Sequence, residues 1–171
     1  EYVIILSGDQ ICKQDYADFL RFHKEKGAEF SVAVMEVDWK EASRFGLMVA
    51  DENDKITEFQ EKPPVPKSNL ASMGIYIFNW DVLKKYLEED EADPNSKNDF
   101  GMNIIPALLR DGRKMYAYHF NGYWRDVGTI DSLWEANMEV LDPENSGIDI
   151  FDEKWKIYSR NPVLPPQKIG P

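Results

Sequence analysis

The stretch Tyr2-Val3-Ile4-Ile5-Leu6-Ser7-Gly8-Asp9 organises the rest of the chain. Its run of apolar, partly β-branched residues predicts a fully buried strand of a parallel sheet. Ser7 and Gly8 end the run, and the carboxylate of Asp9 follows. Because ligands of open α/β sheets bind beyond the carboxyl ends of the strands, Asp9 is a candidate functional residue. An ordinary turn that breaks the strand would explain the same residues.

Composition and charge exclude several classes of protein. The length of 171 residues suits one domain, and the net charge of −11 argues against nucleic-acid or anionic-membrane partners. A substrate with phosphates would therefore need local Lys or Arg. The single cysteine, Cys12, allows no internal disulfide and favours a cytoplasmic location. We find no signal peptide, and no apolar run approaches the roughly 20 residues of a membrane-spanning helix.

Hydrophobic periodicity predicts an α/β fold with a mixed, mostly parallel sheet and flanking helices. Further strands are expected at residues 30–37, 46–50, 55–60, 70–80 and 114–120. Helices are expected at residues 15–26, 82–89, 99–109 and 129–141, the second capped by Asp81. A right-handed parallel crossover is expected from the order of the first strand, the first helix and the second strand. The strands at 46–50 and 55–60 are expected to form a hairpin. Pro106 is expected to kink its helix or mark a late start.

Two aspartates suggest a metal site. Asp9 and Asp126 lie in separate short loops next to glycine, each after an apolar or aromatic segment. Mg²⁺ prefers oxygen ligands and usually takes one or two carboxylates together with substrate phosphates. The pair is therefore a candidate clamp for one ion over a triphosphate. The alternative for Asp126 is a salt bridge with its neighbour Arg125 or a helix cap.

Two further segments carry candidate ligand contacts. Lys62, followed by two prolines that bias it toward an extended conformation, offers a point charge for a phosphate. The preceding Glu61 offers a carboxylate for sugar hydroxyls, although a solvated polar turn explains both residues equally. Ser72 and Gly74, small residues within a bulky strand, indicate close approach of a ligand or a β-bulge. Gly46, at the start of its strand, has the same two interpretations.

These segments together resemble a known family. The motifs are Leu6–Asp9, Ala42–Gly46, Phe59–Pro63, Leu70–Tyr76, Asp99–Gly101, Tyr123–Thr129 and Asn161–Pro166. Over essentially the whole chain they are similar to bacterial glucose-1-phosphate adenylyltransferases, also called ADP-glucose pyrophosphorylases. The resemblance implies a GT-A-like, Rossmann-related nucleotidyltransferase fold whose N-terminal strands are missing here. It further implies that residues 1–141 form the C-terminal portion of a catalytic domain and 142–171 a linker toward an absent β-helix domain.

The resemblance also implies a reaction and roles for residues. The family makes ADP-glucose and pyrophosphate from ATP and glucose 1-phosphate, for glycogen or starch synthesis. By position, Asp9 and Asp126 would hold the catalytic Mg²⁺, and Lys62 would act with them by binding the sugar phosphate. Glu61, Ser72 and Gly46 would contact the sugar. A homotetramer or a hetero-oligomer is the implied assembly of the parent protein.

The sequence departs from the family pattern in places. Gln10 and Asn98 stand where the family usually has His, and Cys12 replaces a common Tyr. The glycine-rich, basic loop that cradles ATP is expected before Glu1, so we expect the chain alone to be inactive or nearly so. The first strand is then expected to form an open edge that favours self-association. Alternatives are a non-catalytic regulatory subunit, or a related pyrophosphorylase that uses UTP or dTTP.

Overall fold

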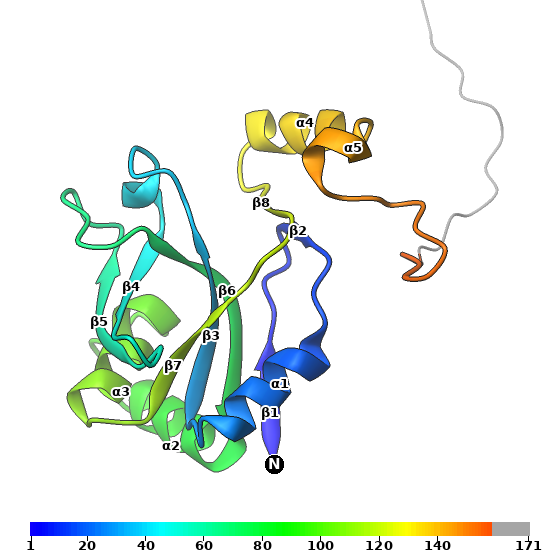
Figure 1. The fold of residues 1–171 in the computed structure, drawn as a ribbon. Coiled ribbons are helices and arrows are strands. Elements are labelled where there is room, and N and C mark those ends of the chain that lie inside the picture. Colours follow the sequence, from blue (N-terminus) through cyan, green and yellow to red (C-terminus); the bar gives the residue numbers. More distant parts are fainter. Residues whose placement is uncertain (159–171) are drawn as a thin grey trace, which may run out of the picture.

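A computed structural model describes residues 1–158, which form a mixed sheet with helices on both faces (Figure 1). The strands are β1 (Tyr2–Ile5), β2 (Gln10–Cys12), β3 (Phe30–Glu36), β4 (Gly46–Ala50), β5 (Ile56–Glu61), β6 (Leu70–Asn79), β7 (Met115–His119) and β8 (Trp124–Asp126). The helices are α1 (Tyr16–Glu25), the 3-10 helix η1 (Ala42–Arg44), α2 (Trp80–Glu91), the π-helical turn η2 (Phe100–Ile104), α3 (Ile105–Arg110), α4 (Ile130–Glu139) and α5 (Pro143–Ser146). The motif at 161–166 and the end of the predicted linker lie outside the described residues.

The predicted α/β fold with flanking helices is confirmed, but the expectation of a mostly parallel sheet is wrong. The main sheet has the order β5-β4-β6-β3-β7, with β1 also paired to β6. Among the described strands, β3 and β7 pair in parallel, whereas the other pairings of this sheet are antiparallel. β1 and β3 run in the same direction, as a crossover requires, but the long β6 lies between them. Apolar periodicity reports which faces of a strand are buried and carries no information on a neighbour's direction.

The prediction that the first strand is fully buried is also wrong. Within residues 1–158, β1 pairs with β6 alone, so its other edge is open. Tyr2 and Ile4 are 47% and 40% exposed, while Val3 and Ile5 pack against the core. An open edge with exposed apolar side chains is the feature on which the predicted self-association depends.

The core lies on both faces of β3. Val32 packs with Leu83 of α2 and Leu108 of α3, whereas the next residue, Ala33, packs with Phe19 of α1. All of them are almost completely buried, and burying one Leu or Phe side chain contributes about 1.5–3 kcal/mol. The central strands are therefore fixed between two helical layers, which makes them a rigid base for the loops at their ends.

The signals predicted for the ends of helices are mostly confirmed. Asp15 caps α1 by accepting a hydrogen bond from the Ala17 amide at 2.8 Å, and Gly27 follows its end in a left-handed conformation. Helix α3 starts late, with Pro106 in its first turn. Of the two expectations for Pro106, the late start is therefore confirmed. Asp81 is not the cap of α2, because the helix already begins at Trp80 and Asp81 lies in its first turn.

A short two-stranded ribbon escaped prediction. Residues 122–129 were expected to form a loop, but β8 within them pairs antiparallel with β2, so that Gln10 lies opposite Asp126. Each strand has three residues, too few to show an alternating pattern. The one-turn helix α5 likewise falls inside the predicted linker. None of the helices in residues 1–158 has the length and apolar character needed to cross a lipid bilayer.

Candidate active site

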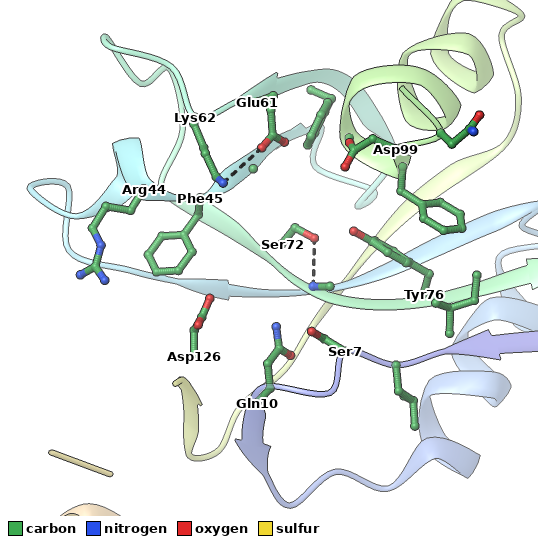
Figure 2. Close-up of a pocket in the computed structure, with 18 residues that line it drawn as sticks. Ser7, Gln10, Arg44, Phe45, Glu61, Lys62, Ser72, Tyr76, Asp99 and Asp126 are labelled. Carbon is green, nitrogen blue, oxygen red and sulfur yellow. Dashed lines mark hydrogen bonds and ion pairs between the residues drawn. The ribbon is translucent and has the colours of Figure 1, made fainter. Parts of the chain in front are cut away.

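Most of the predicted site residues surround one cavity of about 440 Å³ beside the carboxyl end of β1 (Figure 2). The predicted residues in its wall are Gly46, Glu61, Lys62, Ser72 and Asp126. Four of them lie in β4, β5, β6 and β8, and Lys62 directly follows β5. Asp9 is not part of the wall, but Ser7 and Gln10 on either side of it are. Segments far apart in the sequence therefore converge where the first strand ends.

The ribbon of β2 and β8 brings the two aspartates together. The backbone carbonyl of Asp9 accepts a hydrogen bond of 2.9 Å from the Val127 amide. A Cβ placed on Gly128 would lie 3.0 Å from Asp126 Oδ1 and 3.8 Å from Asp9 Oδ2, so both carboxylates flank one point. Gly128 has no side chain to fill that space. Their role as metal ligands stays a prediction, but their positions allow a shared cation.

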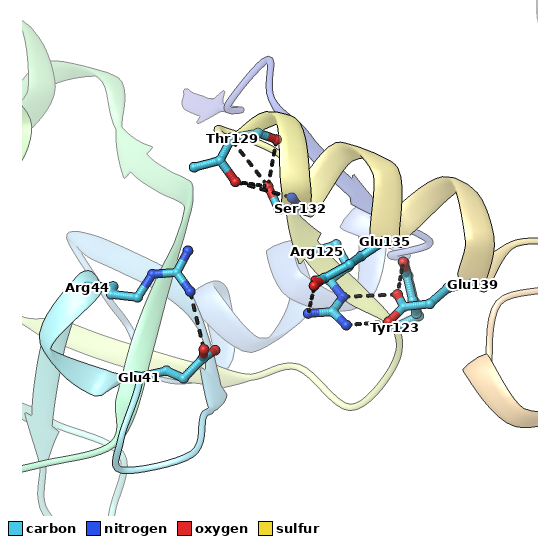
Figure 3. Close-up of polar contacts among 8 residues, drawn as sticks. All are labelled: Glu41, Arg44, Tyr123, Arg125, Thr129, Ser132, Glu135 and Glu139. Carbon is cyan, nitrogen blue, oxygen red and sulfur yellow. Dashed lines mark hydrogen bonds and ion pairs between the residues drawn. The ribbon is translucent and has the colours of Figure 1, made fainter.

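Asp126 is not held by its neighbour Arg125. The guanidinium of Arg125 instead binds Glu139 of α4 through two hydrogen bonds, one of them 2.9 Å from Nε to Oε2 (Figure 3). Tyr123 donates a further hydrogen bond of 2.6 Å to Glu139. Asp126 Oδ1 accepts a hydrogen bond from the Gly128 amide at 2.8 Å, and it faces the cavity. The salt-bridge alternative for Asp126 is therefore wrong.

The donor set suits a hard cation that brings other ligands with it. Residues 1–158 contain no group of three or more His, Cys, Asp or Glu side chains placed to hold a metal ion. Mg²⁺ does not require such a group, because it keeps waters and takes substrate phosphates beside one or two carboxylates. Asp9 and Asp126 therefore match the one or two carboxylates that Mg²⁺ takes beside a phosphate ligand, and they are fewer than the four ligands of a structural zinc site.

Lys62 is held in an unusual backbone conformation. Its φ of 42° is left-handed, although the following Pro63 was expected to favour an extended conformation. The Lys62 amide donates a hydrogen bond of 3.2 Å to the carbonyl of Phe45, which binds the end of β5 to the start of β4. The expectation fails because this tertiary contact outweighs the local preference. Such strained residues cost about 1–3 kcal/mol and cluster at functional sites.

Glu61 is packed between two glycines. A Cβ on Gly46 would lie 3.1 Å from Glu61 Oε2, and a Cβ on Gly101 would lie 2.6 Å from the same atom. Burial raises the pKa of the Glu61 carboxyl, the nearby Asp99 adds to the rise, and Lys62, whose Nζ lies 3.9 Å away, opposes it. The carboxylate is therefore fixed in position and faces the cavity.

The β-bulge interpretation of Ser72 and Gly74 agrees with the structure, and their contact with a ligand stays a prediction. The register between β3 and β6 shifts between Val32 and Val34, opposite this part of β6, so the strand is irregular here. Both residues also line the cavity, and the Gly74 amide donates to Ser72 Oγ at 3.2 Å. At Gly74, where φ is +67°, an added Cβ would lie 3.3 Å from Gln10 Nε2. The irregular strand is the feature that opens room for a ligand.

Sequence reasoning assigned no role to several residues that line the cavity. They include Arg44, Tyr76, Asp99, Phe100 and Gly101. Tyr76 and Phe100 stack with ring centroids 5.5 Å apart. The pKa of the Tyr76 hydroxyl is raised, and burial is the main cause. All five lie within motifs that carried the family resemblance. That membership was the one signal available in the sequence, since their mutual proximity depends on the fold.

A second cavity of about 520 Å³ adjoins the first. Arg44, Phe45 and Asp126 belong to the walls of both. The remaining wall of the second cavity includes Thr129 and Ser132, which form the capping box of α4. The two cavities therefore meet at Asp126, one of the two aspartates proposed to share a cation.

Comparison with known proteins identifies similar sequences over the same region. The family model described as "Nucleotidyl transferase" matches residues 1–143. The chain is 64% identical over 170 residues to a glucose-1-phosphate adenylyltransferase of Clostridium acetobutylicum, covering 99% of this chain and 44% of that protein. It is 65% identical to the protein of the same name in Clostridium beijerinckii, with the same coverage, and 57% identical to that of Geobacillus stearothermophilus, covering all of this chain and 44% of the relative. The chain thus spans less than half the length of these relatives.

Proposed function

The chain belongs to the nucleotidyl transferase family, and we propose that it supplies the sugar-phosphate side of the active site of a glucose-1-phosphate adenylyltransferase. The proposed reaction converts ATP and glucose 1-phosphate to ADP-glucose and pyrophosphate. The observation that carries the proposal is the convergence of Lys62, Glu61, Ser72 and Asp126 on one cavity, with Asp9 beside it. The names of the relatives support the choice of ATP and glucose 1-phosphate.

Glucose binds in the part of the cavity nearest the main sheet. Glu61 accepts hydrogen bonds from sugar hydroxyls, because its carboxylate lies beside Gly46 and Gly101 and lines the cavity. Ser72 offers a hydroxyl from β6 on the opposite side. A carboxylate that is already in place loses little conformational entropy on binding, which favours affinity.

The phosphate of the sugar binds toward Lys62. The side chain of this residue is 66% exposed and its ammonium group lies near the Glu61 carboxylate, so the phosphate replaces water rather than a buried partner. An oxygen of this phosphate attacks the α-phosphorus of ATP in line, a new O–P bond forms, and the bond to pyrophosphate breaks. Such a reaction depends on positioning and charge stabilisation more than on covalent chemistry by the protein.

Asp9 and Asp126 are the residues that would hold Mg²⁺. When bound, the ion would neutralise charge on the phosphates of the nucleotide. The hydrogen bond from the Gly128 amide keeps the Asp126 carboxylate oriented, and the hydrogen bond from Ser7 does the same for Asp9. The two residues act as one clamp, because the β2–β8 ribbon fixes their separation.

Three broader expectations remain part of the proposal. The catalytic portion at 1–141 agrees with the family match to residues 1–143, and 142–171 is proposed as a linker. A cytoplasmic location follows from the metabolic reaction and the single cysteine. A homotetramer or hetero-oligomer is proposed for the longer protein.

Titration of the chain with glucose 1-phosphate in the presence of Mg²⁺ tests the proposal. We expect saturable shifts of backbone NMR signals around Glu61, Lys62 and Ser72. Glucose and inorganic phosphate, used as separate ligands, should each shift one part of this set and bind more weakly. Shifts confined to other surfaces, or none with glucose 1-phosphate at high concentration, would contradict the proposed function.

A further inference from the structure

We infer that Arg44 is a second phosphate-binding residue of this site and shares the phosphate of the sugar substrate with Lys62. This inference rests on the proposed function. Arg44 is the last residue of η1, and its side chain belongs to the walls of both cavities. It therefore belongs to the region where the proposed sugar-phosphate cavity meets the second cavity, whose walls also share Asp126 (Figure 2).

The proposed Mg²⁺ at Asp9 and Asp126 serves the phosphates of the nucleotide, so the phosphate of the sugar is left to the cationic side chains of the first cavity. Its wall carries three carboxylates, those of Glu61, Asp99 and Asp126, against the two cationic side chains of Lys62 and Arg44. A phosphate monoester brings about −1.5 to −2 charges at neutral pH. Lys62 Nζ already lies 3.9 Å from Glu61, so its charge is partly offset before any ligand arrives. Arg44 is the remaining cationic residue of that wall.

Arg44 is free to accept such a ligand at little cost. Its side chain is 58% exposed, and Nη1 donates one hydrogen bond of 3.2 Å to Glu41, the residue that precedes the same short helix. Exposed ion pairs of this kind contribute about 0–1 kcal/mol to stability, so Arg44 loses little free energy when it binds a phosphate in place of Glu41. The guanidinium offers several N–H donors in a planar fork, which matches two phosphate oxygens at once.

The backbone links the two cations to each other. The carbonyl of Phe45, the residue directly after Arg44, accepts the hydrogen bond from the Lys62 amide. The Phe45 amide donates a hydrogen bond of 3.1 Å to the carbonyl of Ala42. The turn that carries Arg44 is thus tied to the strained residue that carries the ammonium group. The backbone contact therefore keeps the two cationic residues in neighbouring segments, and their exposed side chains are free to turn toward a phosphate.

A second exposed arginine of the chain, Arg21, serves as a control for phosphate binding by Arg44. Arg21 in α1 also pairs with a carboxylate three residues before it, Asp18, at 2.8 Å, and it is 64% exposed. It belongs to neither cavity wall. The variants Arg44→Ala and Arg21→Ala therefore remove similar charges and similar ion pairs, and the first also removes a contact with the Phe45 ring, 5.8 Å from the guanidinium carbon to the ring centroid. Of the two residues, Arg44 alone belongs to the cavity walls.

NMR titrations of the full chain with glucose 1-phosphate and Mg²⁺ test the inference. We expect Arg44→Ala to raise the dissociation constant about 10-fold, the size typical for loss of a hydrogen bond to a charged group. Arg44→Lys should lose less, because it keeps the charge but not the fork. Arg21→Ala should match the wild-type protein, and the affinity for glucose without phosphate should be the same in all four proteins.

The outcomes distinguish this inference from the proposed function. Equal dissociation constants for Arg44→Ala, Arg21→Ala and wild type would overturn the role of Arg44 and leave the proposed function standing. Failure of the wild-type protein to bind glucose 1-phosphate would overturn both. If Arg44→Ala does not fold, Arg44→Lys decides, because an affinity equal to wild type in that variant would contradict recognition by a guanidinium fork.

Discussion

The two sides of the candidate cavity are built differently. On the sugar side, Glu61 lies at the end of a strand of the main sheet and is enclosed by Gly46 and Gly101. On the phosphate side, Asp9 and Asp126 come from a ribbon of three-residue strands, and the nearby cations are mostly exposed. Under the proposed function, the sugar would meet a preformed site, whereas the charged groups would complete their arrangement when phosphate and cation bind.

This difference follows from the cost of burying charge. A neutral hydroxyl can be met by a fixed, partly buried carboxylate without a large desolvation penalty. Clustered charges that were fixed and buried before the ligand arrived would destabilise the fold by several kcal/mol. Keeping Lys62 and Arg44 in water avoids that cost.

The largest expected effect is loss of the phosphate contact on replacing Lys62. We predict that Lys62→Ala weakens glucose 1-phosphate binding by about 10- to 100-fold, because a hydrogen bond between charged groups contributes about 1.5–3 kcal/mol. The matched control is Lys67→Ala, since Lys67 is 62% exposed and pairs with Glu58 in the same hairpin region. An equal effect of the two changes in an NMR titration would show that Lys62 does not bind the phosphate.

The next largest effect should come from closing the space around Glu61. Gly101→Ala places a Cβ 2.6 Å from Glu61 Oε2, so the carboxylate or the turn η2 must move. We expect a loss of about 1–3 kcal/mol in the free energy of unfolding, measured with denaturant, and a weaker affinity for glucose 1-phosphate. Gly8→Ala is the control, because nothing lies within 4 Å of its added Cβ. Unchanged stability and affinity in Gly101→Ala would mean that the sugar side is not rigid.

The sequence specified the sugar side in part and the phosphate side hardly at all. The hairpin that positions Gly46 and Glu61 followed from apolar alternation around a polar turn. The ribbon that joins Asp9 to Asp126 could not be predicted in this way, because its strands are too short to show an alternating pattern. The left-handed Lys62 contradicted the local rule for residues before proline, since a hydrogen bond to Phe45 decides its conformation.

The sheet shows the same division between local and tertiary information. Alternating apolar residues located β3 and β6, yet the antiparallel insertion of β6 between β1 and β3 depends on pairings between distant segments. Gly101 and Glu61 are 40 positions apart in the sequence, and their proximity is known only from the distances in the folded structure. Steric complementarity of this kind leaves no periodic trace in a sequence.

A pH titration tests how the strand that carries Asp126 is anchored. Burial, and then the hydrogen bond to Glu139, raise the pKa of Tyr123 from 10.0 to about 12. Because the folded-state pKa lies above the unfolded one, this contribution to stability is complete below pH 10 and is lost between about pH 10 and 12. Glu139→Gln should lower the pKa of Tyr123, as measured from the NMR shift of its ring carbon. An unchanged pKa would place the cause in burial alone.

The smallest expected effect is release of Arg44 from its own helix. Glu41→Gln removes the charge that pairs with Arg44 at 3.2 Å, so the guanidinium becomes more available to phosphate. We predict about a twofold gain in affinity for glucose 1-phosphate, in line with the small contribution of exposed ion pairs. Asp18→Asn, which frees Arg21 in the same way, should change nothing. A loss of affinity in Glu41→Gln would show that Glu41 orients Arg44 instead of competing for it.

The central claim, that Asp9 and Asp126 share one cation beside the phosphates, is tested most directly with Mn²⁺ in place of Mg²⁺. Mn²⁺ broadens NMR signals near its binding site, so with glucose 1-phosphate present the backbone amides of Asp9, Asp126 and Gly128 should broaden together at low Mn²⁺ concentration. Asp9→Asn or Asp126→Asn should restore all three signals at once. Broadening that affects one loop alone, or that persists in both variants, would contradict the shared cation.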